Sequence, residues 1–223
     1  MRKLLLRVFA ALFLALSVAP AAQAAVTITF WSHEFGTRFP HAFFTLRGVP
    51  DAGGPSIDRI YGFTARSVSP ALLFGSVPGR VEPEPPGYVA SSDAQFSVVL
   101  TDVQYGQVLA LIAAWDEHTG DGHYNLNRRN CIHFVKEAAR IAGLTGLDQP
   151  RLMKRPRSYL LAVQAANAGH VVAVNRHGDA YLAALPPVEA AQAVASATPA
   201  DPAVAVPAAP VPPASQPAPA PVN

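Results

Sequence analysis

The pattern of apolar and polar residues predicts strands in the first part of the chain. Four segments rich in β-branched and aromatic residues have the composition of strands: residues 26–31, 41–46, 57–65 and 96–100. Residues 48–55 hold aspartate, glycine and proline, which predicts a turn between the second and third strands. Residues 78–92 are rich in proline and glutamate, and we expect an irregular loop there.

Helical spacing follows in the second half. Thr101 is a candidate N-cap, and one apolar stripe with helical spacing comes after it: Tyr105, Val108, Leu109, Ile112 and Trp115. A second helix is expected over residues 131–142. Asn130 would be its N-cap, and Gly143 would end it in the left-handed conformation.

The end of the chain changes character. A third helix is expected over residues 158–168, and residues 170–182 suggest a short strand with a turn at 177–179. From residue 185 to 223 the chain is almost wholly alanine, proline and valine, which predicts a disordered, partly polyproline-II spacer. One domain over residues 25–184 remains, with strands first and helices after, an order that predicts the α+β class.

Residues 1–24 have the pattern of a secretory signal peptide. The start is basic, a short apolar run follows, and Ala22-Gln23-Ala24 is a small-residue cleavage site. No later segment is long and apolar enough to cross a membrane. We therefore expect cleavage after Ala24 and a periplasmic or secreted protein with no transmembrane segment.

Cleavage would change the charge of the protein. The whole chain has 17 Lys and Arg against 15 Asp and Glu, and loss of three basic residues with the leader would leave 14 against 15. A nucleic-acid-binding protein is expected to carry a basic surplus, so we expect no nucleic-acid partner.

Cys131 is the only cysteine, which excludes an internal disulfide. An unpaired thiol is a liability in an oxidising compartment unless it is buried or used. Helical spacing places it on one face with apolar residues: Phe134, Val135, Ala138 and Ala142. Because backbone N–H groups at a helix start stabilise a thiolate, Cys131 is a candidate nucleophile. The alternative is a small buried core residue.

A thiolate nucleophile needs a general base, which is usually histidine. His41 opens a predicted strand, where the pleat fixes the direction of its side chain, and it is the first candidate. His33 ends the preceding strand and is an alternative base or a third member. His133 lies two positions after Cys131 and points to another side of the helix. A zinc site would need three or four ligands, so we expect neither a metal nor another cofactor.

The segment YNLNRRNCIHFV opens the predicted Cys131 helix with Asn-Cys-x-His-Phe-Val. Together with a histidine on an earlier strand, it resembles the circularly permuted branch of the NlpC/P60 papain-like superfamily, which includes lecithin-retinol acyltransferase and H-Rev107-like proteins. In this branch the histidine strand precedes the cysteine, as His41 precedes Cys131 here. The resemblance implies an α+β domain with the cysteine helix packed on a small antiparallel sheet. It also implies Cys131 as nucleophile and His41 as base.

The same resemblance implies a polar third residue, commonly histidine, on the strand after the base. Residues 57–65 contain no histidine. Folding the hairpin about its turn would bring residues 61–63 opposite His41, so Tyr61 is the best candidate on that strand. His33, on the other neighbouring strand, is the alternative.

These features favour an exported cysteine-dependent hydrolase or acyltransferase that acts on an amide or ester through an acyl-enzyme. The expected substrates are cell-wall peptides or lipid acyl groups in the cell envelope. The alternative is a non-catalytic envelope-binding module that keeps a papain-like cleft. Two further segments are candidate contacts: the tail for other envelope components, and the basic residues 151–157 for an anionic lipid or polymer, unless the latter form a solvated loop.

Overall fold

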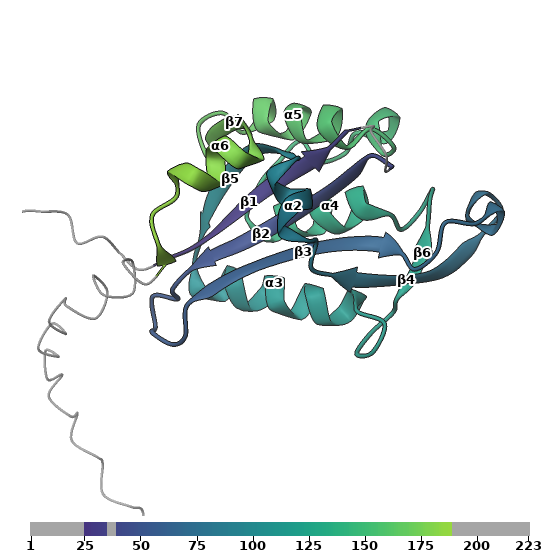
Figure 1. Ribbon diagram of the computed structural model, residues 1–223, viewed down its shortest axis with the longest axis horizontal. Helices are drawn as coiled ribbons and strands as arrows, with labels where there is room; N and C mark the ends of the chain where they lie inside the picture. Colours follow the sequence, from purple (N-terminus) through teal and green to yellow (C-terminus); the bar gives the residue numbers. More distant parts are fainter. Residues whose placement is uncertain (1–24, 35–38, 189–223) are drawn as a thin grey trace, which may run out of the picture.

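A seven-stranded antiparallel sheet crosses the part of the chain that the computed structural model describes, residues 25–34 and 39–188 (Figure 1). The strands are β1 Val26–His33, β2 His41–Gly48, β3 Ile57–Ala65, β4 Ser76–Glu82, β5 Asp93–Leu100, β6 His123–Asn125 and β7 Val172–His177. Their order across the sheet is β6-β4-β3-β2-β1-β5-β7. With the helices that cover it, this sheet confirms the expected α+β class.

The central three strands follow the sequence prediction closely. β1, β2 and β3 are antiparallel neighbours, with Phe30 opposite Phe44 and Phe44 opposite Tyr61. Alternate side chains of β1 and β2 are buried on one face, because large apolar residues recur there at every second position. β2 therefore lies in the middle of the sheet, and His41 is its first residue.

Helices cover both faces of the sheet. One face is covered by α3 Asp102–Trp115, α4 Cys131–Ile141 and α5 Pro156–Ala166, and the other by α2 Pro86–Ala90 and α6 Gly178–Ala184. The predicted caps are confirmed: Thr101 and Asn130 each form a capping box, and Gly143 has a left-handed φ of 82°. The helix starts are thus fixed by the sequence at α3 and α4.

The prediction of an irregular loop over residues 78–92 is wrong. β4 pairs with β3 on one side and with β6 on the other, and α2 follows it. The sequence did not predict β4 or α2, because this segment is rich in proline, which is typical of loops. Pro86 stands in the first turn of α2, where a missing N–H leaves no hydrogen bond unmade.

The turn expected at residues 177–179 is also wrong, because α6 begins there. Gly178 donates its N–H to the carbonyl of Ser92 at 2.7 Å. A Cβ at this position would lie 2.1 Å from the carbonyl oxygen of Val89, so only glycine fits this close approach of two backbones. The glycine marks packing and not a turn.

The predicted leader, residues 1–24, and nearly all of the predicted tail, residues 189–223, lie outside the described residues. Within residues 25–34 and 39–188, none of the helices has the length and apolar character that a membrane span requires.

Candidate active site

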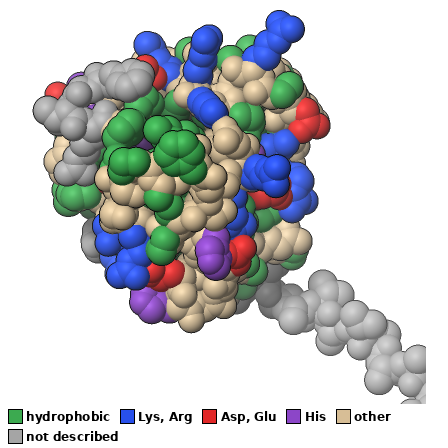
Figure 2. Space-filling model, turned by 90° about the vertical axis from the view of Figure 1, so that its right-hand side faces the viewer, with side chains coloured by type: hydrophobic (Ala, Val, Ile, Leu, Met, Phe, Trp, Pro, Cys, Tyr) green, Lys and Arg blue, Asp and Glu red, His purple; other side chains and the backbone are tan. Residues whose placement is uncertain are grey.

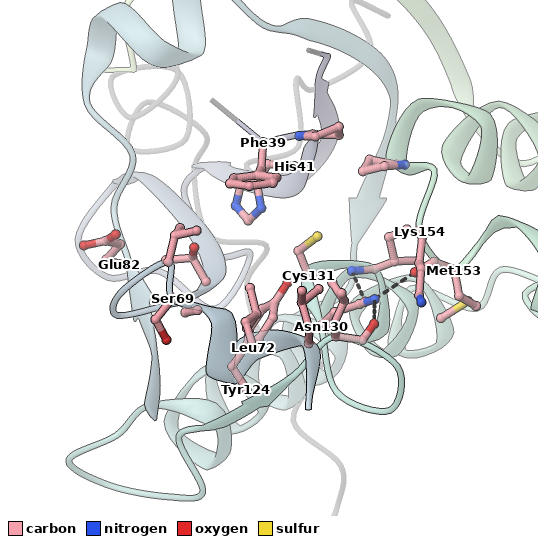
Figure 3. Close-up of a pocket in the computed structure, with 18 of the residues that line it drawn as sticks. Phe39, His41, Ser69, Leu72, Glu82, Tyr124, Asn130, Cys131, Met153 and Lys154 are labelled. Atoms are coloured by element: carbon pink, nitrogen blue, oxygen red, sulfur yellow. Dashed lines mark hydrogen bonds between the residues drawn. The ribbon is translucent and has the colours of Figure 1, made fainter. Parts of the chain in front are cut away.

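A cavity of about 820 Å³ opens at the end of the sheet where β2 begins and β3 ends (Figure 3). Its walls include parts of β2, β3, β4, α2, β6 and the start of α4, together with the β3–β4 connection and residues 153, 154 and 156. The ionisable side chains that line it include His41, Glu84, Tyr124 and Cys131. The cavity thus collects ionisable and hydrogen-bonding groups from distant parts of the chain.

Cys131 is the first residue of α4 and is 6% exposed. The backbone N–H of Ala42 donates a hydrogen bond to its thiol. Since Ala42 follows His41, this bond holds the sulfur against the strand that carries the imidazole. Figure 3 shows the thiol and the imidazole nitrogens directed into the same space. The predicted pairing of Cys131 with His41 is therefore one that the geometry permits.

The start of α4 is fixed by Asn130, which is 2% exposed. Its Oδ1 accepts hydrogen bonds from the backbone N–H groups of Ile132 at 2.9 Å and His133 at 3.2 Å. Its Nδ2 donates to the carbonyls of Leu126 at 2.9 Å and Met153 at 2.7 Å. Asn130 therefore anchors the cysteine to two neighbouring segments and occupies two of the N–H groups that open the helix.

His133 belongs to the helix cap and not to the cavity. Its Nδ1 accepts a hydrogen bond from the backbone N–H of Asn130 at 3.2 Å, which completes the capping box. Burial lowers its pKa, and the nearby Lys136 lowers it further. The expectation that His133 points to another side of the helix than Cys131 agrees with this placement.

His41 is buried at the floor of the cavity. Burial, assisted by the neighbouring His33, lowers the pKa of His41 to about 4. The imidazole is therefore neutral near pH 7 and able to accept a proton. Its Nε2 lies 3.4 Å from Oε1 of Glu84, which is itself 8% exposed. Glu84 therefore faces the imidazole, but burial dominates the pKa of His41.

Glu84 is the residue that sequence reasoning missed. It lies between β4 and α2, in the segment expected to be an irregular loop. Glu82, two positions earlier, also lines the cavity but is paired with Arg80 at 2.8 Å. Nothing in the local sequence distinguishes Glu84 from Glu82. The pairing of β3 with β4 places Gly62 opposite Glu82, and this pairing brings Glu84 to His41.

Gly62 makes room for this pair of side chains. A Cβ at Gly62 would lie 2.6 Å from Nε2 of His41 and 3.3 Å from Oε1 of Glu84. Any side chain here would displace the imidazole or the carboxyl group. A glycine in the middle of a strand, which weakens the strand, is often found where another group approaches closely.

The two predicted third members occupy different places. His33 lies directly opposite His41 in the β1–β2 register, with its Nδ1 3.1 Å from Oγ of Ser92 and its ring stacked on Tyr88. The register predicted for Tyr61 is wrong, because it pairs with Phe44 and its ring packs on the Phe44 ring. Neighbouring residues on a strand point to opposite faces, so Tyr61 lies on the face away from His41.

Tyr124 is a second residue that the sequence did not single out. It lies on β6, is 9% exposed, and its hydroxyl accepts a hydrogen bond from the backbone N–H of Cys131. Burial raises the pKa of Tyr124 well above its usual value, and the adjacent Cys131 raises it further. The hydroxyl therefore stays protonated and can donate a hydrogen bond to a group bound beside the thiol.

The expectation that the helix start holds Cys131 as a thiolate is contradicted. Burial raises the pKa of the thiol to about 11, and the N–H groups of Ala42 and Ile132 only partly oppose this. The resting site thus holds a thiol beside a neutral imidazole. Ionisation of either group alone is opposed by burial, whereas transfer of the thiol proton to His41 creates two opposite charges that stabilise each other.

Comparison with protein-family models, with curated proteins and with solved structures finds no match. Among the described residues, no three His, Cys, Asp or Glu side chains gather in a way that could hold a metal ion.

Proposed function

We propose that this protein is a cysteine-dependent hydrolase or acyltransferase that acts on an amide or ester through an acyl-enzyme. The observation that carries the proposal is the shared cavity, in which Glu84 Oε1 lies 3.4 Å from His41 Nε2 and the Cys131 thiol is held on the strand that bears His41. The roles are nucleophile for Cys131, general base for His41 and orienting carboxyl group for Glu84.

The chemistry follows from these roles. His41 accepts the thiol proton as the sulfur attacks the substrate carbonyl carbon, and the imidazolium is stabilised by Glu84. The negative charge that develops on the carbonyl oxygen is met by the Tyr124 hydroxyl, whose oxygen accepts a hydrogen bond from the N–H of Cys131. His41 then protonates the leaving amine or alcohol, which departs and leaves a thioester. Water or another acceptor then gives its proton to His41 and attacks the thioester carbonyl. The C–S bond breaks, and His41 returns the proton to the departing sulfur, which restores the thiol and the neutral imidazole.

The order of the parts supports a place in the permuted NlpC/P60 branch, because the histidine strand β2 precedes the cysteine helix α4 and packs against it. The departure is the third residue, for which Glu84 after β4 replaces the expected group on β3. The leader pattern of residues 1–24 supports export, and an exported enzyme of this kind would act on cell-wall peptides or lipid acyl groups.

The test is ester turnover by Glu84→Gln with Glu82→Gln as its matched control. Loss of the charge beside His41 is expected to lower kcat about 10- to 100-fold, because it removes stabilisation of the imidazolium but not the nucleophile. Since His41 must be neutral to act, wild-type kcat/KM should rise with pH through about 4 and then level off. Glu82→Gln should retain turnover within a few-fold. Equal rates for the wild type and both variants, or no turnover in the wild type, would refute the assigned role of Glu84.

A second function is favoured by one observation, the raised thiol pKa. A thiol that stays protonated in a cavity of about 820 Å³ also suits a module that binds a ligand without cleaving it. The binding function and the enzyme function differ in the result they predict for Cys131→Ser. For a binding module, this substitution would leave the affinity for the ligand unchanged.

A further inference from the structure

Four large apolar side chains are exposed around the mouth of the cavity, and we call them the mouth patch: Phe39 at 65%, Val68 at 67%, Leu73 at 69% and Phe74 at 87%. Phe39, Val68 and Leu73 line the cavity itself, and Phe74 is the next residue after Leu73. They come from the β1–β2 and β3–β4 connections. Single exposed apolar residues are common, but a group of them beside a cavity indicates an interaction surface.

The exposure of the mouth patch is built into the fold. Leu73 and Phe74 lie at the end of the short helix η1 Pro70–Leu73. The N–H of Leu72 donates to the carbonyl of Ser69, and that of Phe74 to the carbonyl of Ala71, each at 3.1 Å. Leu72 packs against the main core, so η1 is anchored by one side chain. The next two residues project outward.

Cationic side chains flank the mouth patch. Lys154 lines the same cavity, and together with Arg151 and Arg155 it lines the recess beside it. Arg157 follows at the start of α5, and all four are exposed. Figure 2 shows a group of apolar side chains on this face of the molecule, with Lys and Arg side chains above it and to its right. We call Arg151, Lys154, Arg155 and Arg157 the cationic flank.

Acidic groups close to the cationic flank are already paired. Glu82 in the cavity is bound to Arg80, and Asp148 beyond the flank is bound to Lys136. Glu84 faces His41. The surface around the mouth patch is therefore apolar at its centre and positive on one side.

We propose that the mouth patch and the cationic flank dock on the surface of an anionic phospholipid bilayer. Exposed aromatic and aliphatic side chains enter the interface between headgroups and acyl chains, and neighbouring Lys and Arg side chains bind anionic headgroups. The charge of the flank favours a bilayer over a second copy of the chain, because anionic headgroups supply the negative charge that the apolar mouth patch of a second copy lacks. Docking places the mouth of the cavity against the bilayer, and it does not depend on the chemistry of Cys131.

The test uses residues 25–223, which hold every described strand and helix, in flotation with phosphatidylcholine vesicles with and without phosphatidylglycerol. We expect binding to the anionic vesicles and much weaker binding to the neutral ones, with a decrease as salt is raised. Leu73→Ser/Phe74→Ser should weaken partition about tenfold or more. The matched control is Val99→Ser/Val103→Ser, which changes two side chains that are similarly exposed, at 61% and 71%, and do not line the cavity. It should bind like the wild type.

A charge pair tests the flank separately. Arg151→Gln/Arg155→Gln should weaken binding to anionic vesicles several-fold and leave the weak binding to neutral vesicles unchanged. Failure of the wild type to float, or equal flotation of the Leu73→Ser/Phe74→Ser protein, would overturn the proposal. So would a lipid-free dimer that the same double variant dissociates, which would assign the patch to a second copy. Flotation gained only on deletion of residues 189–223 would assign it to the tail.

Discussion

Cys131→Ser is expected to lower the turnover of small ester substrates at least about 10³-fold while the domain remains folded. The thiol is the only sulfur nucleophile of the chain, and it lies in the cavity at the start of α4, held by the N–H of Ala42. A serine hydroxyl at the same place fits the space but is a much weaker nucleophile. It also holds its proton more tightly than a thiol does, and the His41 imidazole, with its low pKa, is a weak acceptor for that proton. Turnover is measured from the release of p-nitrophenol, and folding by circular dichroism.

Ala142→Ser is the control for this substitution. Ala142 lies on the same face of the α4 segment and is 8% exposed, close to the value for Cys131, so it reports what a buried hydroxyl costs by itself. It should keep turnover within a few-fold of the wild type. A folded Cys131→Ser protein that turns over esters at the wild-type rate would show that Cys131 is not the nucleophile.

His41→Ala is expected to lower turnover by about 10³-fold, with a smaller effect on KM. The reason is that the thiol has a pKa of about 11, so near neutral pH it cannot attack unless a neighbouring group takes its proton. The neutral imidazole of His41 is suited to that role. The residual rate of the variant should rise with pH up to about 11, because hydroxide then replaces the base.

The control for the second substitution is His33→Ala. His33 lies opposite His41 on the neighbouring strand, but its ring bonds Ser92 and stacks on Tyr88. The His33→Ala substitution is therefore expected to lower turnover less than about tenfold. A His33→Ala protein as impaired as His41→Ala would transfer the role of base to His33. A His41→Ala protein with wild-type turnover would remove His41 from the mechanism.

Local signals predicted the framework of the site. The segments around His41 and Tyr61 are predicted as strands because they are rich in β-branched and aromatic residues. Asn130 and Gly143 marked both ends of the cysteine helix because caps are chosen by local backbone geometry. The sequence therefore predicts both the first residue of that helix and the first residue of β2.

The remaining parts depend on contacts between distant segments. Glu84 reaches His41 only because β4 pairs with β3 and Gly62 leaves space, and neither feature has a local signature in the sequence. The register of β2 and β3 differs from the one predicted. Tyr61 lies opposite Phe44 and not His41, three positions further along β2, and an odd shift moves a side chain to the other face. The thiol pKa was predicted from the helix start alone, whereas burial, a property of the whole fold, controls it.

The most direct test of the central claim is to trap the acyl-enzyme. The protein is mixed with an excess of p-nitrophenyl acetate, quenched in acid within milliseconds to seconds, and analysed by intact mass and peptide mapping. We predict one acetyl group per chain, found on the peptide that contains Cys131, formed as the first equivalent of p-nitrophenol is released and absent from Cys131→Ser. Steady turnover that depends on Cys131 with no acetyl group at any time point, or an acetyl group on another residue, would contradict the account.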